Sequence, residues 1–337
     1  MANRKLTRRQ AWRIDKIQEE RRKRAQRSGN LGEEALASGE LGEEQWGLVT
    51  AHYGQQVDIE GEQSSQRCFL RSNIDSLVTG DRVVWCSGEP YGVVVAREPR
   101  HSELLRPDPY GKLKPVAANI DLILLVIAPL PIPHANLIDR YLVAAEAVDI
   151  EPVLLLNKAD LIDPPGREQL DELLQPYRDL GYRVLEASCL MSDGLTPLQE
   201  LLNGRTSVFV GQSGVGKSSL VNALLPEAQQ RVAELSETHQ QGVHTTTTAQ
   251  LFHLDGGGSL IDSPGIREFG LWHMEAETVA SGFREFRDLQ GLCRFRNCAH
   301  ADEPGCALKE AAATGSINPA RLDSYHQIVA SLDELEN

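Results

Sequence analysis

The stretch Gly211-Gln212-Ser213-Gly214-Val215-Gly216-Lys217-Ser218 decides the fold of this 337-residue chain. It fits the pattern Gly-x-x-x-x-Gly-Lys-Ser/Thr, with an apolar strand predicted over 207–210 before it and a helix over 217–225 after it. The glycines let backbone N–H groups point at phosphate oxygens, and the helix N-terminus adds the positive end of its dipole. The stretch therefore predicts a phosphate-binding loop, in which Lys217 reaches the terminal phosphates and Ser218 offers its hydroxyl to Mg²⁺.

A second motif, Asn157-Lys158-Ala159-Asp160, directly follows an apolar strand predicted over 153–156. The Asp160 carboxylate can accept hydrogen bonds from the ring N–H and the amine of guanine. Adenine offers neither donor, so a buried carboxylate would discriminate strongly between the two bases. We expect Asn157 to brace the loop and the stem of Lys158 to lie over the base. By itself the motif could be a helix N-cap, but beside a phosphate loop it indicates a guanine-nucleotide site.

A short box, Ala187-Ser188-Cys189, ends the strand that is predicted over 183–187. GTPases place a Ser-Ala pair at this point, and its backbone lies behind the base. We therefore expect Ser188 to belong to the nucleotide site, although Cys189 stands where alanine is usual.

A third motif, Asp262-Ser263-Pro264-Gly265, follows the strand predicted over 259–261. We expect Asp262 to hold Mg²⁺ through water and the Gly265 N–H to face the γ-phosphate, although the motif alone could be a simple turn. Ile266 occupies the position at which Ras-like proteins keep a glutamine that positions the attacking water. An apolar side chain cannot orient water, so another group has to do so.

The threonine-rich segment 242–248 lies between the phosphate loop and the third motif, where the first switch of a GTPase belongs. We expect Thr246 to bind Mg²⁺ through its hydroxyl and the γ-phosphate through its N–H, because of its offset from the next strand. His244 is the local candidate for the missing water-positioning group. The alternative is a histidine that is simply exposed in a loop.

The order of the three motifs is unusual. In most guanine-nucleotide switch domains the phosphate loop leads, the Asp-x-x-Gly box follows, and the Asn-Lys-x-Asp box comes near the end. Here the base-reading motif precedes the phosphate loop, which defines a circularly permuted GTPase. The Asp-x-x-Gly box then leads straight into the C-terminal residues, so a nucleotide-driven movement there can be passed directly to a neighbouring domain.

The rest of the chain predicts three flanking parts around this α/β domain, which we assign to residues 113–274. The apolar run 120–127 is typical of a parallel strand covered on both faces, and the alternation of strands and helices after it predicts a doubly wound sheet. Residues 45–112 hold five short β-rich segments that fit an OB-like β-barrel, with an SH3-like barrel as the alternative. Residues 1–44 resemble a flexible tail, and residues 275–337 predict a C-terminal helical domain. In that domain Asn318 caps a helix to about residue 335.

Four residues with metal-ligand chemistry lie close together in the C-terminal domain: Cys293, Cys298, His300 and Cys306. Three thiols and one imidazole within fourteen residues suit a closed tetrahedral zinc site, which is structural because it leaves no open position for water. The alternatives are buried free cysteines, which explain His300 poorly, and disulfides, which are rare in a cytosol.

The charge distribution is asymmetric. The chain carries a net charge of −14, yet residues 1–27 hold eleven Lys or Arg against three acidic residues, so this arm is +8 and the remainder −22. A basic arm on an acidic body indicates nucleic-acid contact, with a solvated tail as the equal alternative. The longest apolar stretch, 122–130, is too short to span a bilayer, and no apolar signal core precedes it, so we expect a cytoplasmic protein.

By the combination of these features, the chain resembles the ribosome small-subunit-dependent GTPase A family (RsgA/YjeQ). Residues 117–121 (Ala-Ala-Asn-Ile-Asp) and 138–142 (Ile-Asp-Arg-Tyr-Leu) match the family as well, and the resemblance covers roughly residues 45–310. It implies that residues 157–160 and 211–219, including Ser219, bind GTP, that the cysteine–histidine set binds zinc, and that His244 lies in the segment implicated in hydrolysis.

The resemblance also implies a late maturation factor for the small ribosomal subunit, whose weak GTP hydrolysis the subunit stimulates. We expect a monomer that docks on rRNA, with one structural zinc ion and with Mg²⁺ accompanying GTP. The main alternative is a nucleotide-gated RNA-binding module in which hydrolysis is incidental. A metabolic GTPase acting on a small molecule fits less well, because neither the basic tail nor the barrel forms an obvious small-substrate pocket.

Overall fold

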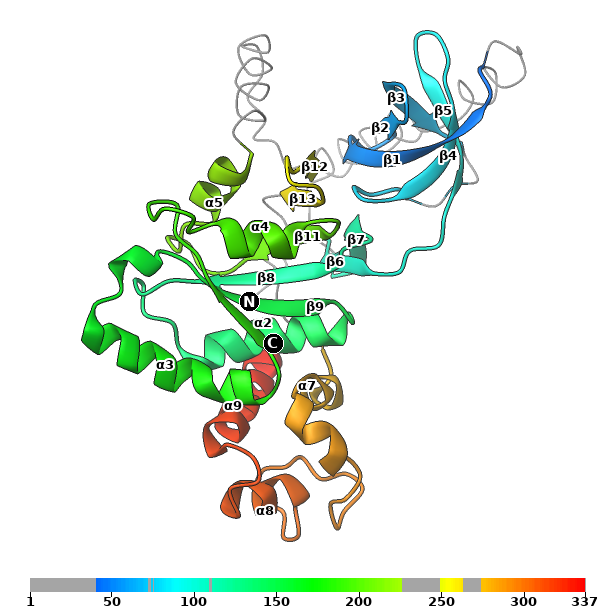
Figure 1. The fold of residues 1–337 in the computed structure, drawn as a ribbon. Coiled ribbons are helices and arrows are strands. Elements are labelled where there is room, and N and C mark those ends of the chain that lie inside the picture. The colour runs from blue at the N-terminus through cyan, green and yellow to red at the C-terminus, as the bar shows by residue number, and fades with distance from the viewer. Residues whose placement is uncertain are drawn as a thin grey trace, which may run out of the picture. The chain divides into compact units, whose positions relative to one another are not determined.

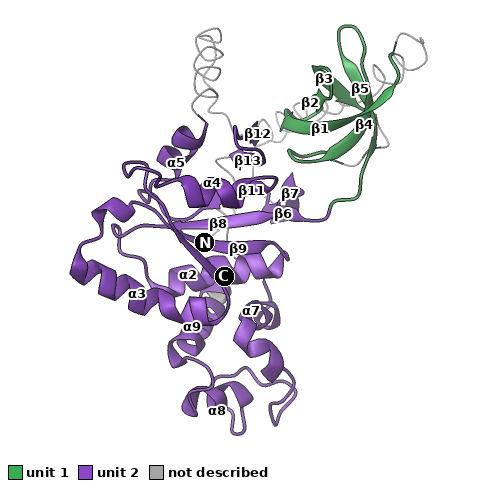
Figure 2. Ribbon diagram, viewed as in Figure 1, with its two compact units in different colours: residues 1–100 green, residues 101–337 purple. Residues whose placement is uncertain are grey.

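The computed structural model describes residues 41–71, 74, 76–108, 111–225, 249–262 and 274–336. The chain divides into two compact units, residues 1–100 and residues 101–337 (Figure 2). Each unit has its own apolar core. Among the described helices, none is both long enough and apolar enough to cross a membrane.

Five strands form a closed barrel in the first unit (Figure 1). Their order is β1-β2-β3-β5-β4, and β4 pairs back with β1. All pairs are antiparallel except β3 with β5, and a parallel pair needs a crossover rather than a hairpin. This topology confirms the OB-like prediction and excludes a simple succession of antiparallel hairpins. The strands are β1 (Glu44–His52), β2 (Gln56–Gly61), β3 (Ser65–Leu70), β4 (Arg82–Cys86) and β5 (Gly92–Arg97).

The period-two pattern of each strand fills the barrel. In β2, Val57 and Ile59 are fully buried while the residues between and after them are partly exposed, and Trp85 of β4 lies in the same core. A buried ion pair adds to this unit, because Arg100 donates through Nε and Nη2 to the two carboxylate oxygens of Asp81 at 2.6 and 2.8 Å. A paired arrangement of this kind satisfies both buried charges.

The second unit contains the predicted α/β sheet, in the order β10-β9-β8-β11-β13-β12. The first five strands are parallel, and β12 is antiparallel to β13. All six residues of β8 are buried, as expected for a central strand covered by helices on both faces. The strands are β8 (Leu122–Ile127), β9 (Glu151–Leu156), β10 (Arg183–Glu186), β11 (Thr206–Val210), β12 (Gln250–His253) and β13 (Ser259–Asp262). The helices are α2 (Ala135–Ala147), α3 (Pro164–Asp179), α4 (Thr196–Leu202) and α5 (Lys217–Leu224).

A β-hairpin that the sequence pattern did not reveal precedes β8 in the chain and forms a two-stranded sheet of its own. It consists of β6 (Glu103–Pro107) and β7 (Leu113–Ala118). Ser102 closes the open end of the hairpin, because its hydroxyl donates to the Ile120 carbonyl and accepts from the Ile120 N–H, both at 2.7 Å. The hairpin belongs to the second unit, which begins at residue 101, although β6 lies within the range that we assigned to the barrel.

The C-terminal residues are helical and continue the second unit. Helix α7 (Ala276–Gly282) and helix α9 (Pro319–Glu336) both pack against α2, while η3 (Arg284–Leu289) and α8 (Ala307–Ala313) lie between them in sequence. The side chain of Asn318 accepts a hydrogen bond from the Ala320 N–H at 3.0 Å, so the predicted N-cap of the last helix is present.

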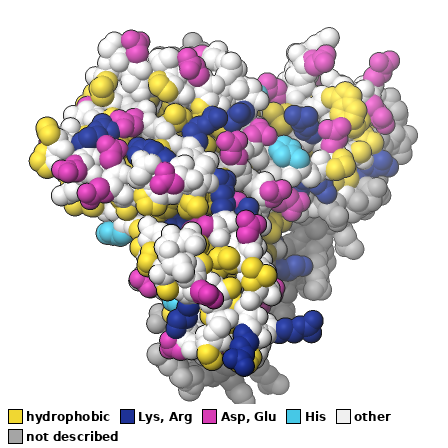
Figure 3. All heavy atoms as spheres, turned by 60° about the horizontal axis from the view of Figure 1, so that its bottom comes forward, with side chains coloured by type: hydrophobic (Ala, Val, Ile, Leu, Met, Phe, Trp, Pro, Cys, Tyr) yellow, Lys and Arg dark blue, Asp and Glu magenta, His cyan; other side chains and the backbone are white. Residues whose placement is uncertain are grey.

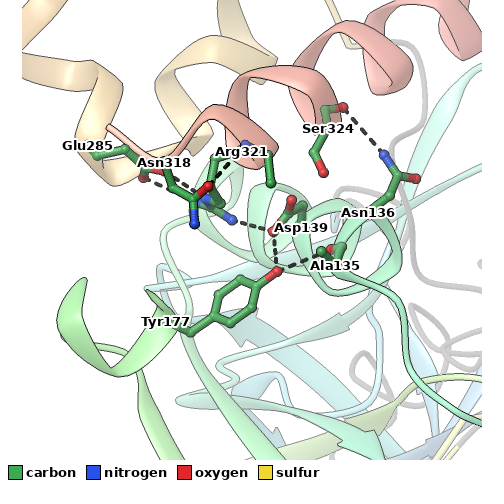
Figure 4. Close-up of polar contacts among 9 residues, drawn as sticks. Ala135, Asn136, Asp139, Tyr177, Glu285, Asn318, Arg321 and Ser324 are labelled. Carbon is green, nitrogen blue, oxygen red and sulfur yellow. Dashed lines mark hydrogen bonds and ion pairs between the residues drawn. The ribbon is translucent and has the colours of Figure 1, made fainter. Parts of the chain in front are cut away.

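A buried polar network fastens these helices to the sheet domain (Figure 4). Arg321 of α9, whose side chain is 3% exposed, forms ion pairs with Asp139 of α2 and with Glu285 of η3, the latter through Nε at 2.6 Å. The Tyr177 hydroxyl of α3 donates to Asp139 at 2.7 Å, and the Arg321 guanidinium lies 4.6 Å from the centre of the Phe283 ring. Desolvation raises the pKa of Asp139, and the positive charge of Arg321 opposes that rise.

Candidate nucleotide site and metal centre

The glycine loop leaves the carboxyl end of β11 and enters α5. Gly211 has a φ of 130° and Gly216 a φ of 95°, both in the left-handed region. A Cβ atom at residue 211 would lie 2.3 Å from the carbonyl oxygen of Val126, and one at residue 216 would lie 2.4 Å from Nδ2 of Asn157. Both positions therefore require glycine for backbone conformation and for space.

The base-reading motif lies directly against this loop. Asn157 is 2% exposed, and its Nδ2 donates to the Val215 carbonyl at 2.9 Å. Lys158 adopts a left-handed conformation, with φ at 58°, and its Nζ donates to the Gly214 carbonyl at 2.6 Å. The two motifs, far apart in sequence, thus share hydrogen bonds, because parallel strands deliver their carboxyl ends to one edge of the sheet.

Asp160 lies in the short turn η1 (Ala159–Leu161) and is exposed. The Ser188 hydroxyl donates to one of its carboxylate oxygens at 2.5 Å, and Ser188 Oγ in turn accepts from the backbone N–H of Leu190 at 3.0 Å. Ser188 therefore orients the carboxylate that would read the base. The sequence placed Ser188 behind the base, but nothing in the motif spacing revealed this direct contact with Asp160.

The remaining described residues of the predicted site occupy the same edge of the sheet. Lys217 Nζ donates to the carbonyls of Gly211 and Gln212 at 2.6 and 2.5 Å, so its ammonium lies within the loop. Ser213, Ser218 and Ser219 are exposed at the loop and the first turn of α5. Asp262 is the last residue of β13, which pairs in parallel with β11, the strand before the phosphate loop. Asp262 therefore lies at the same edge of the sheet as that loop. His244, Thr246 and Gly265 lie outside the described residues.

The four predicted metal ligands come together in the C-terminal part of the second unit. The ligand atoms of Cys293, Cys298, His300 and Cys306 all lie within 4.8 Å of one another. The Nδ1 atom of His300 is 3.5 Å from the Cys293 sulfur and 3.4 Å from the Cys306 sulfur. A set of this composition and spacing could hold a metal ion.

Hydrogen bonds from residues outside the four predicted ligands hold the cluster in place. The sequence pattern did not reveal these contacts. The Ala307 N–H donates to the Cys293 sulfur at 3.3 Å, and Nε2 of His326 in α9 lies 2.7 Å from the carbonyl oxygen of His300. Such second contacts orient metal ligands. His300 itself has φ at 61°, a conformation rarely adopted by a residue with a side chain.

Burial shifts the pKa values of two residues of the cluster in opposite directions. Desolvation lowers the pKa of His300 and so favours the neutral imidazole that binds metals. Desolvation, with the neighbouring thiols, raises the pKa of Cys298 to about 11, so a bound cation would have to displace its proton.

The order of motifs along the chain and the order of strands in the sheet define the class of protein. It is a circularly permuted P-loop GTPase with an N-terminal five-stranded barrel and a C-terminal Cys₃His cluster. A family model described as RsgA GTPase matches residues 97–272. The chain belongs to the RsgA GTPase family.

Full-length relatives and solved structures agree with this assignment. The small ribosomal subunit biogenesis GTPase RsgA of Pseudomonas fluorescens (strain Pf-5) is 60% identical over 340 residues, covering 99% of each chain. The crystal structure of YjeQ from Thermotoga maritima is 33% identical with a TM-score of 0.71, covering 86% of this chain and 99% of that one. YloQ, described as a circularly permuted GTPase, is 29% identical with a TM-score of 0.68, covering 87% and 96%.

Proposed function

We propose that this protein hydrolyses GTP during late maturation of the small ribosomal subunit, binds the rRNA of that subunit and is stimulated by it. The observation that carries the proposal is the contact between the base-reading and phosphate loops, in which Asn157 and Lys158 donate to the carbonyls of Val215 and Gly214. This contact would assemble a guanine site, and a relative that is 60% identical over almost the whole chain bears the name of a small-subunit biogenesis GTPase.

The chemistry that we propose is in-line attack of water on the γ-phosphate. Lys217 and the loop N–H groups would stabilise the negative charge that spreads over the phosphate oxygens. The Ser218 hydroxyl and Asp262, with Thr246 as the expected third group, would hold Mg²⁺, which neutralises charge on the same oxygens. His244 is our candidate for positioning the water, because Ile266 cannot do so.

For the cysteine–histidine cluster we propose one structural zinc ion. Three thiolates and one imidazole satisfy the tetrahedral preference of zinc and leave no position open for a substrate.

The parts that flank the nucleotide domain would dock on rRNA. They are the tail 1–44, the barrel and residues 275–337. The protein would work as a monomer in the cytoplasm, where ribosomes assemble.

The test is GTP turnover by the purified protein with and without small ribosomal subunits. We expect slow hydrolysis alone and a marked increase with small subunits, with large ribosomal subunits as the matched control. Equal turnover under all three conditions would contradict the proposal.

A second measurement tests the alternative, a nucleotide-gated RNA-binding module. Unchanged affinity for rRNA with GTP, GDP and a non-hydrolysable analogue would exclude nucleotide-gated RNA binding.

Asp160→Asn should abolish the preference for guanine, because an amide donor would then face the two donors of the base. We expect a loss of GTP affinity corresponding to about 1–3 kcal/mol. Xanthosine triphosphate, which has a carbonyl in place of the amine, should bind the variant better than GTP does. Competition binding measures the affinities of the variant for GTP, ATP and xanthosine triphosphate. Asp179→Asn, which replaces an exposed carboxylate at the end of α3, is the control. Unchanged selectivity for GTP over ATP would refute the assignment.

Cys298→Ala should release zinc and loosen residues 280–310, because binding of structural zinc is coupled to local folding. Elemental analysis and hydrogen exchange measure the two effects. Cys189→Ala, an exposed cysteine outside the cluster, should keep its zinc. Less than half an equivalent of zinc in the wild-type protein, purified without chelators, would argue against the site.

Removal of residues 1–27 should weaken binding to the small subunit and flatten its dependence on salt, since fewer phosphate counterions are released. The measurement is the slope of log affinity against log salt concentration. The same slope in the truncated and full-length proteins would mean that the basic arm is only a solvated tail.

A further inference from the structure

The loop between the first two cysteines of the cluster exposes an aromatic ring, and an arginine lies on each side of it in the sequence. Phe295 is 43% exposed, and Leu292, just before the loop, is 65% exposed. Arg294 and Arg296 are also exposed, and neither forms an ion pair with any residue that the structure describes. The Arg294 guanidinium lies 5.5 Å from the centre of the Phe295 ring, so charge and ring form one surface.

The loop is held in place although its side chains are exposed. The Arg294 N–H donates to the Gly305 carbonyl at 3.0 Å, and the Cys298 N–H donates to the Phe295 carbonyl at 3.3 Å. The cysteine ligands at both ends tie it to the proposed metal. A ring on a fixed loop loses little conformational entropy when it binds a partner, which favours affinity.

The loop itself carries positive charge only. Residues 292–300 contain two arginines and no acidic residue, in a chain whose net charge is −14. The nearest acidic side chains in sequence have partners of their own, since Asp302 pairs with Lys309 at 3.1 Å and Glu303 accepts from the Ala299 N–H at 2.9 Å. Figure 3, which brings the C-terminal elements forward, shows basic and hydrophobic side chains side by side on this part of the molecule.

We propose that this loop is a stacking site for an unpaired nucleotide of RNA. The Phe295 ring would stack on the exposed base, while Arg294 and Arg296 would contact the phosphates on either side. An aromatic face between cations matches a single-stranded nucleotide, because every base offers a π-face and every linkage a negative charge. The inference rests on the proposed function, because that function implies an RNA partner. It assigns part of the recognition of that RNA to one loop.

The experiment compares full-length variants for binding to two probes: protein-free rRNA of the small subunit, and the intact subunit. Phe295→Leu keeps an apolar side chain but removes the ring, and it should weaken binding to both probes at least about five-fold without changing the salt slope. Arg294→Gln and Arg296→Gln should each reduce the salt slope by about 0.7, the value for one contact with a single strand. Lys309→Gln, which removes a cation already paired with Asp302, is the control and should leave binding within two-fold.

Zinc content and GTP affinity, measured on every variant, show whether that variant is correctly folded. Wild-type affinity of Phe295→Leu for protein-free rRNA, or an equal loss in Lys309→Gln, would overturn the inference. A loss confined to the intact subunit would assign the ring to a ribosomal protein and also overturn it. Subunit-stimulated GTP turnover of the wild-type protein tests the proposed function separately, because the binding measurements on rRNA do not depend on hydrolysis.

Discussion

Replacing Arg321 with alanine should lower the free energy of unfolding of the second unit by about 3–5 kcal/mol. The substitution leaves the carboxylates of Asp139 and Glu285 inside the protein without their cation, and a buried charge without a partner is strongly destabilising. It also removes the guanidinium that lies against the Phe283 ring. Native-state hydrogen exchange of peptides from α2 and α9 in urea measures this unit separately from the barrel.

The destabilisation by Arg321→Ala should be smaller at pH 5 than at pH 8. Burial already raises the pKa of Asp139, and loss of the nearby positive charge raises it further, so mild acid neutralises the unpaired carboxylate in the folded state. The folded variant then binds more protons than the unfolded chain, and its stability rises as the pH falls toward the unfolded pKa. Arg167→Ala is the control, because its ion pair with Glu186 is 39% exposed on both sides and should contribute about 0–1 kcal/mol. A similar loss in both variants would contradict the role of burial.

His244→Ala should lose most of the subunit-stimulated rate of hydrolysis, about 10²–10⁴-fold, while GTP affinity stays unchanged. The reason is that Ile266 cannot orient the attacking water, whereas an imidazole in the switch segment could be brought within hydrogen-bond distance of it. We propose that other residues, in the phosphate loop and at Asp160, make the contacts that bind nucleotide. Single-turnover hydrolysis on the small subunit, with nucleotide affinity measured in parallel, gives both quantities.

The control for this prediction is His253→Ala, in a strand of the same unit. It should keep the stimulated rate. Wild-type stimulation in His244→Ala would move the water-positioning role to rRNA or to the threonine run at 245–248. A loss of GTP affinity alongside the rate would instead place His244 in nucleotide binding.

Local sequence predicted the elements of the sheet domain and the residues of both candidate sites. The phosphate loop, the base-reading motif and the apolar run of β8 each combine residue types whose geometry has few alternatives, such as Gly211 and Gly216 at positive φ. The four candidate metal ligands are close in sequence, so a short segment was enough to indicate them. Signals of this kind depend on spacing, and spacing is visible without a structure.

The contacts that join distant segments were decided only by the tertiary structure. The hydrogen bond from Ser188 to Asp160, the contact of His326 with His300 and the hairpin β6–β7 have no pattern of their own in the sequence. Pro115 within β7 weakens the strand signal, because proline cannot donate to a ladder. The hairpin is instead closed by the hydrogen bonds of Ser102, just before β6, with Ile120, just after β7.

The sequence by itself therefore determined a permuted guanine-nucleotide domain, a barrel before it and a cysteine–histidine cluster after it. Only the tertiary structure decided that the C-terminal helices join the nucleotide domain in one compact unit, through Arg321 between Asp139 and Glu285. The physical reason is that a motif is encoded by neighbours in the chain, whereas a buried ion pair depends on which helix faces meet. Residues 139 and 321 are an ordinary aspartate and arginine until folding removes them from water.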